Sequence, residues 1–316
     1  MYAAGSPPRA AAQDMPLRLA RAKRRAVDRP SPSAQDRMLR EYLTDMTRPY
    51  GAALREELFD QPAGHFYGEM AAVLVSQTVS AVAPVDLIVL AYAIPDVRPG
   101  RSTAAHLSHL CPGRPMAFAV YDQGAAAPFT GLRLMGEYLR SGDCRRALLV
   151  VVEQGAVHYQ LPAPAAVPAR SIAVALLCGS EGSGRLDTVH LRAGVEPGRA
   201  GELLAKEIAE LSAGRDDTTL IVGNGLGSGL ASGAAGQVII APSGQPCTGT
   251  WWELAGGLGT WAAEGRRVLL ADYEPMLGYL CVSAFDIEAG RPAARPAAGV
   301  QAMASKVRPI TDERRR

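Results

Sequence analysis

Two segments of the chain, one in each half, repeat the same local pattern. Arg145 and Arg146 precede the apolar run 147–152 and then Glu153. Arg266 and Arg267 precede a similar apolar run and then Glu274, at the same offset. Each segment also follows a long predicted helix, over 126–141 in the first case and 250–264 in the second. A pattern that recurs at the same place in two matching strings of elements indicates an internal duplication. We therefore predict two βαβαββ-like halves, each with helices on its sheet.

The alternation of apolar runs and amphipathic stretches predicts the elements of each half. In the first half we expect strands over 86–93, 116–121, 146–153 and 171–178, and helices over 102–110 and 126–141, the former capped by Ser102. In the second half we expect helices over 199–211 and 250–264 and strands over 218–222, 237–241, 268–273 and 278–287. Polar residues interrupt the apolar stretch 73–95, so it predicts a helix followed by a buried strand rather than a membrane span.

The two ends of the chain are rich in Pro, Ala and Arg. We predict a partly flexible N-terminal segment over 1–40, a first half over 41–195, a second half over 196–287 and a flexible tail over 288–316. The basic run 21–25 (RAKRR) is interpreted as part of the solvated segment rather than as a nucleic-acid-binding arm. A net charge of +2 is too close to balance for a broad nucleic-acid-binding face.

The cysteine pattern and the absence of known motifs exclude several classes of protein. The five cysteines are widely spaced and form no CxxC pair, which fits a reducing cytosol and neither a disulfide framework nor a zinc site. The glycine-rich run 223–229 (GNGLGSG) does not satisfy GxGxxG, so we interpret it as a tight turn. No secretory signal opens the sequence. We expect a cytoplasmic protein without a membrane span, a metal or a cofactor.

Several segments resemble one family of acyl-condensing enzymes. Residues 86–96 (DLIVLAYAIPD) resemble the strand that ends in a TPD-like turn in β-ketoacyl-acyl-carrier-protein synthase III, and 116–120 (MAFAV) resembles the strand leading to its nucleophile. Residues 139–153 resemble the helix exit and next strand, and 268–285 the paired last strands. The resemblance covers roughly 87–287 and implies the thiolase fold, with duplicated halves forming a layered αβαβα sandwich.

The reaction centre that this resemblance implies is missing from the sequence. The family places a cysteine at the N-terminus of a buried helix, where the helix dipole and free N–H groups stabilise a thiolate. Here that position corresponds to Gly124 or Ala125, depending on the direction of counting, and no cysteine lies between Cys111 and Cys144. Asn224 stands at the position of the family's histidine and Cys247 approximately at that of its asparagine. All three positions have changed.

Three residues remain as weak catalytic candidates. Cys247 precedes a helix and would be a relocated nucleophile, but we favour a small buried cysteine. Asp122 lies in the old nucleophile loop and would act as a base, but we favour a helix cap. His158 follows the strand 146–153 and would reach over a pocket, but we favour a solvent-exposed loop residue.

Three functions are compatible with this pattern. The first, which we place slightly ahead, is a cysteine-less ketosynthase III-like subunit of fatty-acid, polyketide-type or other secondary metabolism that pairs with an active homologue. The second is an acyltransferase or condensing enzyme with non-standard chemistry. The third is a non-catalytic homodimer that binds a carrier protein or ligand. Each implies acyl-carrier protein or acyl-coenzyme A as partner and a homodimer or heterodimer as assembly.

Overall fold

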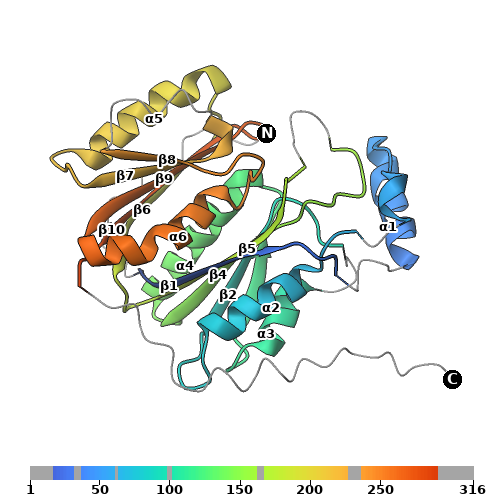
Figure 1. Ribbon diagram of the computed structural model, residues 1–316, viewed down its shortest axis with the longest axis horizontal. Helices are drawn as coiled ribbons and strands as arrows, with labels where there is room; N and C mark the ends of the chain where they lie inside the picture. The colour runs from blue at the N-terminus through green and yellow to red at the C-terminus, as the bar shows by residue number, and fades with distance from the viewer. Residues whose placement is uncertain are drawn as a thin grey trace.

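The strands form one mixed ten-stranded sheet in the computed structural model, which describes residues 17–31, 37–60, 63–97, 102–161, 167–226 and 236–290 (Figure 1). The strand order is β3-β2-β4-β5-β1-β6-β10-β9-β7-β8. The elements of the first half are β1 (Arg18–Val27), α1 (Arg37–Thr47), α2 (Tyr67–Thr78), β2 (Leu87–Ala91), α3 (Thr103–Leu110), β3 (Met116–Val120), α4 (Ala127–Ser141), β4 (Arg146–Glu153) and β5 (Ser171–Gly179). Those of the second half are β6 (Gly184–Arg192), α5 (Pro197–Ser212), β7 (Thr218–Val222), β8 (Gln237–Ile240), α6 (Gly249–Glu264), β9 (Arg266–Glu274) and β10 (Tyr279–Ile287). Short 3-10 turns lie at η2 (Arg48–Tyr50), η3 (Glu56–Leu58), η4 (Gly124–Ala126) and η5 (Asn224–Leu226).

The sheet is symmetric about the contact between β1 and β6. Reading outwards from that contact, β5, β4, β2 and β3 on one side correspond to β10, β9, β7 and β8 on the other. The directions match as well, because β2 is parallel to β3 and β4, and β7 is parallel to β8 and β9. We propose that the two halves begin at β1 and β6, rather than at residues 41 and 196.

The helices and strands form five layers, and three hydrophobic clusters hold these layers together. The largest lies between the two halves and includes Phe129 of α4 and Trp251 of α6, whose rings meet edge to face at 4.9 Å between centroids. Helices α4 and α6 both contact strands of both halves. A second cluster packs α2 and α3 on the outer face of the first half, and a third packs α5 on the outer face of the second. This is the predicted αβαβα sandwich.

Most predicted elements are confirmed to within a few residues. Helix α3 is one example: Ser102 is its N-cap, and its side chain accepts a hydrogen bond from the Ala105 N–H at 3.3 Å. Strand β4 covers the predicted range 146–153. The apolar stretch 73–95 contains the end of α2 and then β2. Among the described residues, no helix is both long and apolar enough to cross a membrane.

The prediction of a flexible N-terminal segment is wrong for residues 18–27. These residues form β1, which pairs with β5 along its length and lies at the centre of the sheet. Two features concealed the strand in the sequence. A bulge between Leu19 and Arg21 breaks the alternation of inward and outward side chains, and the inward positions Ala22 and Ala26 are small. Residues 1–16 and the tail beyond 290 lie outside the described residues, so the predictions for them stand as predictions.

Candidate functional site

The candidate site lies between the two halves, where β4 and β9 end and where α4 and α6 begin. These are the positions that the duplication predicts to be equivalent. Parallel strands present their carboxyl ends at one edge of a sheet, and helix N-termini present unpaired N–H groups. The repeated Glu153 and Glu274 are the last residues of β4 and β9. Both carboxylates accept hydrogen bonds at this edge of the sheet.

Glu153 is bound by four donors at the N-terminus of α6. Its carboxylate accepts hydrogen bonds from the Cys247 N–H at 3.1 Å and the Thr248 N–H at 3.0 Å. The Thr248 hydroxyl and the Gln245 amide also donate to it, the latter at 3.0 Å. Glu153 is 2% exposed, and burial raises its pKa against the opposing effect of these donors. The side chain therefore joins the end of β4 to the central helix of the other half.

Glu274 makes the equivalent contact in the opposite direction. Its Oε2 accepts a hydrogen bond from the Ala125 N–H at 2.9 Å, at the turn η4 that leads into α4. Its Oε1 accepts from the Met276 N–H at 3.1 Å. Each half thus ends a strand on a glutamate that binds the entry of the other half's central helix. An anion at such an entry is stabilised by the free N–H groups and the helix dipole.

The Glu274 carboxylate fills the space beside Gly124 and Ala125. Gly124 has φ +52°, and a Cβ added to it would lie 1.7 Å from Glu274 Oε2. Only glycine fits this position while the carboxylate stays in place. Thus Gly124 and Ala125, which the resemblance aligns with the nucleophile, lie against a carboxylate supplied by the chain itself. Neither side chain carries a reactive atom.

Asn224 and Cys247, which the resemblance aligns with the family's other two site positions, both have structural roles. The Asn224 Nδ2 group donates to the carbonyls of Pro242 and Gln245, each at 3.0 Å, so its amide holds the loop before α6. Cys247 is 1% exposed, and its pKa is well above the ordinary value because burial and then the nearby Glu153 disfavour the thiolate. A thiol in this environment is a poor nucleophile at neutral pH, which supports the interpretation of Cys247 as a small buried residue.

Asp272 is a site residue that the sequence analysis missed. It lies on β9, is 2% exposed and accepts hydrogen bonds from the N–H groups of Tyr273 at 2.9 Å and Gly225 at 3.3 Å. Burial raises its pKa to about 8. The repeated glutamates were visible in the sequence as part of the duplication, but Asp272 has no counterpart in the first half, where Val151 stands at the same offset.

Asp272 should make the stability of the protein depend on pH. The folded carboxyl keeps its proton up to about pH 8, whereas an unfolded aspartate releases it near pH ~4. Folding then takes up a proton within this window, so the free energy of unfolding falls as pH rises from ~4 to ~8, by at most about 1.4 kcal/mol per pH unit. We expect urea denaturation to show lower stability at pH 8 than at pH 5.5.

The Asp272→Asn variant isolates this effect, because its amide oxygen can accept the same two N–H groups without a charge. We expect the pH dependence to become shallower in this variant. Asp216→Asn, at an exposed position, is the matched control and should keep the wild-type dependence. An unchanged slope in Asp272→Asn would show that other groups carry it.

The structure contradicts the expected role of Asp122. The N-cap positions of η4 and α4 are Gln123 and Ala126, and neither makes a side-chain cap. Asp122 is exposed with φ +58°, and Glu274 occupies the entry that Asp122 was expected to cap. The prediction failed because the residue that binds this helix entry, Glu274, is far from Asp122 in the sequence.

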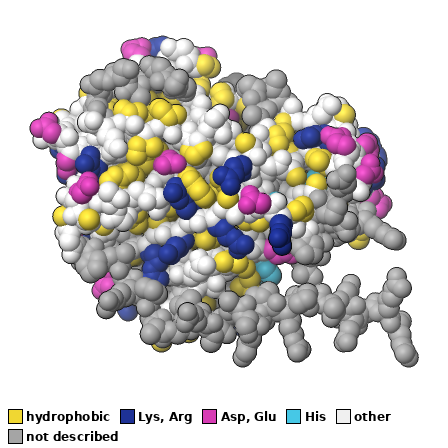
Figure 2. Space-filling view, in the orientation of Figure 1, with side chains coloured by type: hydrophobic (Ala, Val, Ile, Leu, Met, Phe, Trp, Pro, Cys, Tyr) yellow, Lys and Arg dark blue, Asp and Glu magenta, His cyan; other side chains and the backbone are white. Residues whose placement is uncertain are grey.

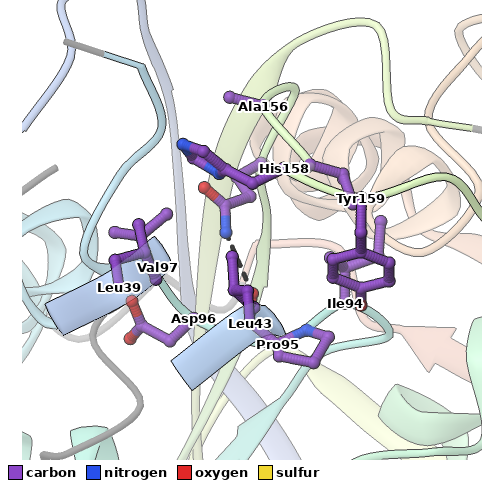
Figure 3. A pocket seen from close by; sticks show the side chains of 11 residues that line it. Leu39, Leu43, Ile94, Pro95, Asp96, Val97, Ala156, His158 and Tyr159 are labelled. Atoms are coloured by element: carbon purple, nitrogen blue, oxygen red, sulfur yellow. Dashed lines mark hydrogen bonds between the residues drawn. The ribbon is translucent and has the colours of Figure 1, made fainter. Parts of the chain in front are cut away.

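The structure also contradicts the exposed position expected for His158. This residue is 3% exposed and lines a small cavity beneath α1, at the carboxyl ends of β2 and β4 (Figure 3). Leu39 and Leu43 of α1 cover it, and Asp96 and Tyr159 lie at its other walls. The His158 Nε2 atom is buried without a hydrogen-bond partner among the described residues, and burial lowers the His158 pKa, which favours the neutral imidazole. No group of acidic, histidine or cysteine side chains suited to a metal ion occurs in the described part of the chain.

Comparisons with known proteins identify the architecture. Neither the protein-family models nor the curated protein sequences match this chain. Solved structures do. ChlB3, described as an acyltransferase, is 17% identical, with a TM-score of 0.59 over 88% of this chain and 99% of its own. The 3-oxoacyl-(acyl carrier protein) synthase III FabH of Pseudomonas aeruginosa is 16% identical, with a TM-score of 0.55 over 86% of this chain and 98% of its own.

The fold is the thiolase fold. A third thiolase-fold structure carries ligands: an OleA variant from Xanthomonas campestris, with bound lauric acid and lauroyl-CoA, is 13% identical with a TM-score of 0.54 over 87% of this chain and 99% of its own. At these identities the likeness establishes the thiolase fold and not the activity.

Proposed function

We propose that this protein is a non-catalytic ketosynthase III-like subunit that pairs with a cysteine-bearing homologue in acyl-thioester metabolism. The observation that carries the proposal is the Glu274 carboxylate hydrogen-bonded to the Ala125 N–H. Condensation through an acyl-enzyme needs a nucleophile at the helix entry and free donors for the oxyanion. Here a glycine and an alanine stand at the entry, and an internal anion already uses the donor.

A free sheet edge supports the pairing part of the proposal. Strand β3 is paired with β2 on one side only, at one end of the described sheet. Met116 at its start is 49% exposed and Tyr121, directly after it, is 52% exposed. An open edge with apolar side chains is a template for a strand of a second chain. A thiolase-fold partner with the same edge would extend the sheet.

Co-expression tests the proposal directly. We expect the chain, produced together with a cysteine-bearing homologue encoded beside it, to elute as a stable heterodimer whose mass is the sum of the two. Intact-mass measurement after incubation with an acyl-coenzyme A should show acylation of the partner and none of this chain. Replacing Ala119 of β3 with proline should weaken the pairing, because proline is poorly tolerated in a paired strand.

Two results would overturn the proposal. One is a homodimer that turns over acyl thioesters alone, which would favour an acyltransferase with non-standard chemistry. His158, with its buried and unpartnered Nε2, would then be the first residue to replace. The other is a homodimer that neither reacts nor accepts the homologue, which would favour a non-catalytic homodimer that binds a carrier protein or ligand.

A further inference from the structure

Positive charge is concentrated on one strand of this nearly neutral chain. Residues 18–29 contain six basic side chains and one acidic side chain, a net charge of +5, although the whole chain carries only +2. The remaining residues therefore sum to −3. The excess is a local property of β1 and the residues that follow it.

Three basic side chains of β1 lie at the surface although the strand is central. Lys23, Arg24 and Arg25 are exposed, and none of the ion pairs among the described residues involves them. They are exposed because β1 pairs with β6 only through Arg18 and Leu19, so the rest of that edge is open. Figure 2 shows Lys and Arg side chains gathered over the middle of this face, where Figure 1 shows β1 passing between α2 and α6.

The basic side chains of β1 lie on both faces of the strand. Ala22 and Ala26 pack inward and Val27 packs on the outer face, so strand alternation puts Arg21, Lys23 and Arg25 on the outer face in a row. Arg24 points the other way. Its guanidinium lies 4.4 Å from the Trp252 ring centroid and donates to the Trp252 carbonyl at 2.8 Å, which holds it beside α6. Arg21 is held by the Thr78 carbonyl at the end of α2, at 3.0 Å.

No carboxylate among the described residues forms an ion pair with Lys23 or Arg25. Asp28 is engaged by Arg170 at 3.7 Å and is largely exposed, and Arg146 adds further positive charge near Arg21, whose pKa burial and Arg146 lower. The row therefore presents a positive surface in which Arg21 is held by the Thr78 carbonyl and Lys23 and Arg25 are exposed.

We propose that this row, defined as Arg21, Lys23 and Arg25, docks an acidic helix of a partner protein. Side chains two apart on a strand lie about 6.6–6.8 Å apart along it, whereas residues four apart on a helix rise about 6.0 Å. A helix with an acidic residue on every turn therefore matches the row charge for charge. This proposal is independent of whether the chain is catalytic.

A labelled peptide tests the docking surface. The probe is a helical alanine-based peptide with glutamate at every fourth position, and its counterpart carries glutamine instead. We expect fluorescence anisotropy to show binding of the glutamate peptide that weakens as salt rises, with no binding of the glutamine peptide. Lys23→Glu/Arg25→Glu should lower the affinity at least tenfold. The control Arg199→Glu/Lys206→Glu, which makes the same charge change on exposed positions of α5, should leave the affinity unchanged.

Several outcomes would overturn the proposal. Equal binding by the two charge-reversed variants would show that only the net charge matters. Tighter binding of a short DNA duplex than of the peptide would assign the row to polyphosphates instead. A third outcome is absence of peptide binding in wild type together with full solubility of both variants, which would show that the charges only keep the open strand edge from aggregating. If Lys23→Glu/Arg25→Glu does not fold, Lys23→Gln/Arg25→Gln gives the same comparison with a smaller change.

Discussion

Glu153→Ala should lower the free energy of unfolding by about 3 kcal/mol or more. The substitution removes the acceptor of the Cys247 and Thr248 N–H groups, for which the described residues provide no other. Each buried donor left unsatisfied costs about 1–3 kcal/mol, and the loss exceeds what is regained by no longer burying a carboxylate. Urea denaturation followed by circular dichroism measures the change.

Two further variants define what Glu153 does. Glu153→Gln keeps the volume and one acceptor oxygen, so its effect should be smaller than that of Glu153→Ala. Glu137→Ala removes a half-exposed carboxylate of α4 that pairs with Arg140, and it should change stability by no more than about 0.5 kcal/mol. A loss below about 1 kcal/mol in Glu153→Ala would mean that the two halves are joined at α6 by packing rather than by this carboxylate.

The second large effect is expected from Gly124→Ala. The added methyl group displaces the Glu274 carboxylate and breaks its hydrogen bond to the Ala125 N–H, which costs about 1.5–3 kcal/mol because the acceptor is charged. The left-handed backbone at φ +52° adds about 1–2 kcal/mol. We expect a total loss of about 3 kcal/mol in thermal or urea unfolding.

A double-mutant cycle separates these two contributions. In a Glu274→Ala background no carboxylate is displaced, so Gly124→Ala should cost only the backbone strain, and the coupling between the two substitutions should be at least about 1 kcal/mol. Gly142→Ala is the matched control, since Gly142 also has positive φ (+84°) but a Cβ there meets nothing within 4 Å. Additivity of Gly124→Ala and Glu274→Ala would contradict the internal occupation of the helix entry.

These experiments bear on function because the same two contacts close the candidate site. Glu274 contacts the position that the resemblance aligns with the nucleophile, and Glu153 contacts the loop that contains Cys247. If both contacts are as strong as expected, the site has become a joint between the two halves. A joint of this kind would support the proposed non-catalytic role.

Much of the architecture could be predicted from the sequence because its signals are local. Continuous apolar runs predicted β2, β4 and β9, Ser102 predicted the start of α3, and the repeated Arg-Arg and Glu predicted the duplication. Strand β1 could not be predicted, because its charges resemble a solvated segment. Those charges can lie at the sheet centre because β6 begins at Gly184, opposite Leu19, and leaves the rest of that edge of β1 unpaired.

The chemistry of the candidate site was likewise only partly predictable from the sequence. The sequence by itself determined which groups are absent: no cysteine stands at the helix entry, and no histidine follows His190. Only the tertiary structure decided what replaces them, because a helix N-terminus accepts any anion that reaches it and the sequence does not say which one does. Glu274 reaches α4, and Glu153 reaches α6, only when the two halves pack face to face. The repeated glutamates were visible in the sequence; their exchange between the halves is a property of the fold.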